Sequence, residues 1–194
     1  MVLSLTVLVG PMACSPAERL DKANLPDRRL APVLASMQHT IDTLDADPVT
    51  QWRSGWVGNM FTNVLGEGNR GLCYHWQEAI ARGVAPSVRQ AGLSMVGLAV
   101  NVANGLEHHA VVIFDPAAVS AGWETDPATV AAFFKRTDAT VLDGWERGRA
   151  DAYPMQSWIR HHTVGSAGPA LELIDFFELS PGPAAQTSGQ RSYP

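Results

Sequence analysis

Cysteine is scarce in this sequence, so each position is informative. The 194 residues include two cysteines, Cys14 and Cys73, with no Cys pair at the short spacing of a zinc site. No two histidines have the helical spacing of His-Glu-x-x-His, and no Gly-rich phosphate loop or dinucleotide fingerprint occurs. The sequence therefore predicts no metal and no other cofactor. A metal site remains a lesser alternative because several histidines are available: His75, His108, His109, His161 and His162.

Basic clusters and long apolar runs are also missing. The net charge is −5 and Lys and Arg are dispersed, so we expect no nucleic-acid partner. The apolar run at the N-terminus is shorter than the roughly 20 residues that cross a bilayer as a helix. An apolar fraction of 46% with 17% charged residues is typical of a globular protein, and the length favours one domain.

The N-terminal segment predicts export. Residues 1–13 are apolar and end in Ala13 directly before Cys14, which resembles the signal of a bacterial lipoprotein. In such proteins the cysteine becomes the lipidated first residue. We therefore expect a signal segment at 1–13, a tether at 14–28 and a membrane-anchored lipoprotein of the cell envelope. The alternative is a buried N-terminal strand in which Cys14 is incidental.

Helices are expected in the first half of the chain. Apolar residues at three- and four-residue spacing predict a helix over 29–44, and Trp52, Trp56 and the residues that follow predict another that ends near 66. A third helix should begin at 69 or 71, run to about 82 and end at Gly83. Cys73 would lie in its first turn, partly exposed.

Strands are expected in the second half. Side chains alternate between two faces over 94–103 and over 107–114, and Asn104-Gly105 between these segments is a strong hairpin signal. A further strand is expected over 140–145. His109 would share a face with Val111 and Ile113, with His108 on the other face. A capped helix is predicted over 126–136, and residues 181–194 resemble a disordered tail. The fold class is α+β.

The order Cys73, His109, Asp143 suggests nucleophilic catalysis. A thiolate is stabilised at the start of a helix, a histidine can take its proton, and a carboxylate can orient the histidine. His108 competes with His109 as the base, and Asp115 competes with Asp143 as the carboxylate. Asp115 precedes a proline and is expected to end its strand in a turn.

Three short motifs resemble the core of transglutaminase-like cysteine enzymes, which belong to the papain-like class. They are Gly71-Leu-Cys73, His109-Ala-Val-Val and Val141-Leu-Asp-Gly-Trp145. The resemblance implies a papain-like catalytic domain over 29–180, with N-terminal helices packed on an antiparallel sheet. It also implies Cys73 as nucleophile, His109 as general base and Asp143 as the orienting carboxylate.

By the same likeness, Trp52 or Trp56 could donate a hydrogen bond to the oxyanion. We therefore expect an exported, lipid-anchored cysteine enzyme that forms a thioester at Cys73 with a peptide, amide or acyl substrate. Hydrolysis is expected rather than cross-linking. The alternatives are a non-enzymatic lipoprotein binding module with a degenerate papain-like fold and, less favoured, acyl transfer like that of arylamine N-acetyltransferases.

Overall fold

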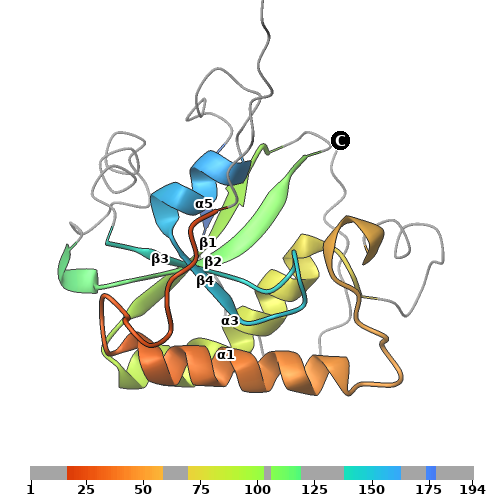
Figure 1. Cartoon of the computed structure of the whole chain (residues 1–194), viewed down its shortest axis with the longest axis horizontal. Coiled ribbons are helices and arrows are strands. Elements are labelled where there is room, and N and C mark those ends of the chain that lie inside the picture. Colours follow the sequence, from red (N-terminus) through yellow and green to blue (C-terminus); the bar gives the residue numbers. More distant parts are fainter. Residues whose placement is uncertain (1–16, 59–69, 103–105, 119–137, 163–173, 178–194) are drawn as a thin grey trace, which may run out of the picture.

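The protein has an α+β fold in which helices cover both faces of one sheet (Figure 1). The computed structural model describes residues 17–58, 70–102, 106–118, 138–162 and 174–177. Helices α1 (Leu30–Asp45) and α3 (Cys73–Gln90) pack on one face, and α5 (Met155–His162) packs on the other. In Figure 1 the sheet lies between α1 below and α5 above.

The sheet has five strands in the order β4-β3-β2-β1-β5, and every neighbouring pair is antiparallel. The expected strands that begin near 94, 107 and 140 are confirmed. The strands are β1 (Ser94–Val100), β2 (His108–Phe114), β3 (Thr140–Asp143), β4 (Asp151–Pro154) and β5 (Ile174–Phe177), with a short 3-10 turn η1 (Pro116–Ala118) after β2.

Helix α1 confirms the prediction for 29–44. Its apolar stripe is buried and forms one hydrophobic cluster with α3 and with one face of the sheet. Burial of such a stripe is the main source of stability for a helix of this length. The buried residues of the stripe are Leu30, Val33, Leu34, Met37 and Ile41.

Helix α3 corrects the prediction that Gly83 ends a helix. The helix continues to Gln90, and Gly83 instead faces Thr40 of α1, where an added Cβ would overlap the threonine side chain. The glycine therefore permits a close approach of two helices. The chain turns after the helix at Gly92, which has a positive φ of 66°, a conformation favoured by glycine.

The side chains of β2 alternate between two separate hydrophobic clusters. Val111 and Ile113 belong to the cluster under α1 and α3, whereas Ala110 and Val112 belong to the cluster under α5. His109 therefore lies on the face of β2 that also carries Val111 and Ile113, and His108 lies on the face that carries Ala110 and Val112, as the strand pattern predicted. The chemistry of the two histidines is therefore decided by different sides of the sheet.

Residues 18–20, within the expected tether, lie on the domain. The Glu18 N–H donates to Ser157 Oγ at 2.9 Å, and the Leu20 N–H donates to the Ala152 carbonyl at 2.8 Å. These bonds tie part of the segment to α5 and β4, and the tether over 14–28 stays a prediction.

Several expectations concern residues outside the described ranges. They are the signal segment 1–13 with Cys14, most of the second helix, the turn at 104–105, the helix over 126–136 and the tail 181–194. Within the described ranges, no helix combines the length and the apolar character needed to cross a membrane.

Candidate active site at the start of helix α3

Strand register brings His108, and not His109, to Asp143. Val112 of β2 lies opposite Val141 of β3, so Asp143, two residues further along β3, shares a face with His108. His108 Nε2 is 2.7 Å from Asp143 Oδ2, and the side chains are only 4% and 1% exposed. The expected pairing of His109 with Asp143 is wrong, because alternation points them to opposite faces.

Asp143 is held by three donors. Its Oδ1 accepts the Trp145 backbone N–H at 2.9 Å, and its Oδ2 accepts both His108 Nε2 and, at 2.8 Å, Trp158 Nε1. Burial alone would raise the pKa of this carboxyl, but the charge and hydrogen bond of His108 outweigh burial and lower it to about 2. Asp143 is thus an ionised, oriented acceptor.

His108 has one ring nitrogen committed and one available. Nε2 bonds Asp143, whereas Nδ1 is buried and has no hydrogen-bond partner that meets normal geometry among the described residues. Burial opposes a charge on the ring, but Asp143 and, to a smaller extent, Cys73 raise the pKa of His108 to about 10. The ring is therefore held by Asp143 through Nε2, while Nδ1 stays available to a second group.

Cys73 is the first residue of α3 and is partly exposed, as expected. Its Sγ lies 3.8 Å from the carbonyl oxygen of Glu107, the residue before His108. The preceding loop is tied to the end of β3, because Trp145 Nε1 donates to the Gly71 carbonyl at 2.6 Å. One tryptophan therefore positions the segment that carries the thiol relative to the strand that carries Asp143.

His109 lies on the opposite face of β2 and has its own carboxylate. Its Nε2 is 2.6 Å from Glu107 Oε1, and its Nδ1 is 3.4 Å from Gln77 Oε1 of α3. Gln77 in turn donates to the carbonyls of Leu98 and Ala110, in the sheet. His109 thus belongs to the contact between α3 and the sheet.

The other expected site residues lie elsewhere. Asp115, the rival carboxylate, pairs with Arg29 at 2.7 Å beyond the far end of β2 from His108. The Trp52 ring packs edge-on against Trp76 at 5.4 Å between centroids. Trp56 is 59% exposed and lies edge-on to Trp145.

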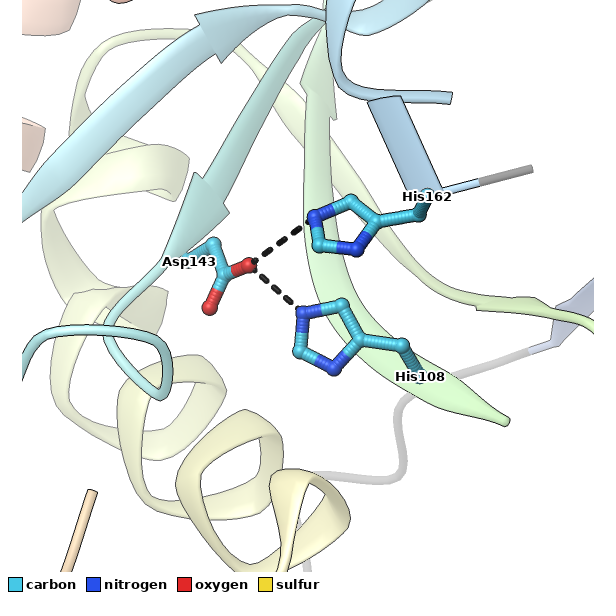
Figure 2. Close-up of side chains that lie close together, drawn as sticks. All are labelled: His108, Asp143 and His162. Atoms are coloured by element: carbon cyan, nitrogen blue, oxygen red, sulfur yellow. Dashed lines mark hydrogen bonds and ion pairs between the residues drawn. The ribbon is translucent and has the colours of Figure 1, made fainter. Parts of the chain in front are cut away.

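A second histidine, His162, lies beside His108 and Asp143, a position that the sequence did not predict. His162, at the end of α5, lies beside His108 with ring centroids 4.4 Å apart and the rings tilted by 43°, and its Nε2 is 4.0 Å from Asp143 Oδ2 (Figure 2). Burial, and then the charge of His108, lower the pKa of His162 to about 3. The sequence shows only that His161 and His162 are adjacent; the packing of α5 on the sheet brings them to β3.

Glu146 joins this group from the turn that follows β3. Its Oε1 is 3.6 Å from His162 Nε2 and 3.5 Å from His161 Nε2. Three histidines and two carboxylates thus gather at one end of the sheet, under α5. Comparison of the chain with protein-family models, curated proteins and solved structures finds no match in any of the three.

Proposed function

We propose that the protein is a cysteine enzyme that transfers an acyl group through a thioester on Cys73. The observation that carries the proposal is the buried His108 ring, which bonds Asp143 through one nitrogen and interacts with Cys73. A nucleophile, a base and a group that orients the base are the minimum for this chemistry. His108 replaces His109 as the proposed base.

The proposed first step begins with a thiolate at Cys73 and a proton on His108. The sulfur attacks the substrate carbonyl carbon and forms a C–S bond, while the carbonyl π electrons move to oxygen. As the tetrahedral intermediate collapses, the C–N bond of an amide breaks, and His108 Nδ1–H protonates the leaving amine. The ionised Asp143 keeps the ring oriented and offsets its charge.

Water completes the proposed cycle. Neutral His108 takes a proton from water at Nδ1, the hydroxide oxygen attacks the thioester carbon, and the C–S bond breaks to release a carboxylic acid and the thiolate. The backbone N–H of Cys73 at the start of α3 is one candidate donor to the oxyanion. Trp52 or Trp56 as the second donor stays a prediction.

The wider assignment rests on the sequence. We propose a transglutaminase-like, papain-like hydrolase with a peptide or amide substrate, exported and anchored by lipid at Cys14. The antiparallel sheet with helices packed on it is compatible with the α+β class that this proposal requires. Hydrolysis is favoured over cross-linking because water is always present and no described residue marks a site for an amine.

A chemical trap tests the proposal without knowledge of the natural substrate. In a Cys14→Ser background, the full chain is mixed with p-nitrophenyl acetate, quenched in acid and mapped by mass spectrometry. We expect a burst of p-nitrophenol and an acetyl group on Cys73. Cys73→Ala should lose both, whereas His39→Asn, on the exposed side of α1, should lose neither. Absence of a burst, with Cys73 unmodified in the folded protein, would contradict the proposal and favour the binding module.

A further inference from the structure

The cluster of Glu146, His161 and His162, here called the α5 cluster, brings three side chains with possible metal-ligand atoms close together. The nitrogen atoms His162 Nε2 and His161 Nε2 lie 3.6 and 3.5 Å from Glu146 Oε1, and one ligand atom from each of the three residues lies within 4.8 Å of the others. Two imidazoles and one carboxylate are a donor set that binds zinc in proteins.

Two of the three ligand–ligand spacings can be compared with those of known coordination geometries. Bonds of about 2.0–2.1 Å at tetrahedral angles place neighbouring ligand atoms roughly 3.4 Å apart. An octahedral site with similar bonds would need roughly 3.0 Å, because its angles are 90°. The 3.5 and 3.6 Å separations in the α5 cluster are closer to the tetrahedral value.

A buried atom in the cluster is without a hydrogen bond. His162 Nε2 is enclosed and has no hydrogen-bond partner within the described ranges, although it points toward Asp143 (Figure 2). A buried polar atom left in this state costs about 1–3 kcal/mol. A cation bound at this nitrogen would remove the cost and would also be attracted by two carboxylates.

The surroundings of the cluster suit a cation that enters from solvent. His161 and Glu146 are 26% and 28% exposed, so an ion can reach them, while His162 at 11% closes the inner side. Both histidines lie in the last turn of α5, where unpaired carbonyls carry partial negative charge. The Asn101 side chain donates to the His162 carbonyl at 2.8 Å and anchors that turn.

We propose that Glu146, His161 and His162 bind one divalent zinc-class ion in tetrahedral coordination, with water as the fourth ligand. Asp143 Oδ2 is 4.0 Å from His162 Nε2 and already accepts two hydrogen bonds, so it neighbours the ion and can accept a hydrogen bond from that water. The site is separate from the proposed nucleophile Cys73 and goes beyond the proposed acyl transfer.

Metal titration of a protein without thiols tests the site. The full chain carrying Cys14→Ser and Cys73→Ser is treated with chelator, and Zn²⁺ is then titrated by calorimetry and Co²⁺ by absorption. We expect one ion per chain and the intense visible bands of tetrahedral Co²⁺, with no comparable binding of Mg²⁺. Because no thiol and no substrate is involved, failure of the acyl-transfer proposal leaves this result unaffected, and the reverse also holds.

Three variants assign the ligands. Glu146→Gln, His161→Asn and His162→Gln should each weaken Zn²⁺ binding by more than the about 10–100-fold that outer-shell changes cause, whereas His39→Asn should not. If His162→Gln does not fold by circular dichroism, the two more exposed positions decide. Unchanged affinity in Glu146→Gln and His161→Asn, octahedral Co²⁺ spectra, or absence of binding would each overturn the proposal.

Discussion

The two faces of strand β2 each carry a histidine paired with a carboxylate, and the pairs differ in burial rather than in distance. His108 and Asp143 are 2.7 Å apart and almost fully enclosed under α5, whereas His109 and Glu107 are 2.6 Å apart with the glutamate 29% exposed. Water screens the second pair but barely reaches the first. A short contact alone is therefore a poor guide to a catalytic base.

His108 and His109 also differ in the residues that surround them. Cys73 contributes to the raised pKa of His108, whereas His109 is held by Gln77 in the packing of α3. Trp145 and Trp158 both donate to Asp143. The α5 face of the sheet thus supports its histidine with several oriented groups, which is typical of a functional site.

The largest expected effect is on the rate of Cys73 acylation when His108 or His109 is replaced by alanine. His108→Ala should reduce acylation of Cys73 by p-nitrophenyl acetate by about 10³-fold or more, because base catalysis and its orientation are lost together. His109→Ala should change the rate by less than about tenfold. Burst rates by stopped flow measure both.

An inactive His109→Ala beside an active His108→Ala would reverse the assignment of the two faces. Equal rates in both variants would show that neither ring serves Cys73. Circular dichroism spectra of each variant are the control, since His108 is buried and its loss also removes packing.

A smaller effect is expected on the pH dependence of stability. The pKa of His108 is raised above its unfolded value of about 6.5, to about 10. Its contribution to the free energy of unfolding is therefore complete below pH 6.5 and is lost as pH rises through 10. Asp143→Asn should lower the unfolding free energy at pH 6.5 by about 3–5 kcal/mol, since one partner of a buried pair is removed.

Asp143→Asn should also flatten the decline in stability between pH 6.5 and pH 10. Urea unfolding at several pH values across this range measures the slope. Glu107→Gln is the matched control on the other face of β2, and its slope should equal that of the unaltered protein. A slope that Asp143→Asn leaves unchanged would mean that another group titrates there.

The smallest expected effect is on the α1 side of the sheet, away from the site. Gly83→Ala should lower the unfolding free energy by about 1–3 kcal/mol, because the new methyl group meets Thr40 across the contact of α1 and α3. The rate of Cys73 acylation should stay within about twofold. Thermal unfolding measures the first effect and the burst assay the second.

Gly92→Ala provides the comparison for that substitution. A Cβ at Gly92 meets no atom within 4 Å, so its cost comes only from the positive φ of the backbone. If Thr40→Ala does not relieve the Gly83→Ala variant, the loss does not come from this contact.

Local patterns in the sequence predict much of the framework. The apolar spacing of α1 and the alternation in β1 and β2 are properties of single segments, so each can be recognised without its neighbours. The sequence also indicates Cys73 and Asp143 by their places at the start of a helix and on a late strand. The prediction that Gly83 ends a helix is wrong, because a glycine that ends a helix and one that admits another helix look alike in sequence.

The sequence by itself determined the α+β class, the separation of His108 and His109 onto opposite faces, and the helix start that carries Cys73. Only the tertiary structure decided which histidine meets Asp143, because a shift of one residue in the register of β2 and β3 would exchange them. It also decided that His161, His162 and Glu146 meet beside Asp143. Such contacts arise from the packing of α5 on the sheet, and spacing along the chain carries no information about that packing.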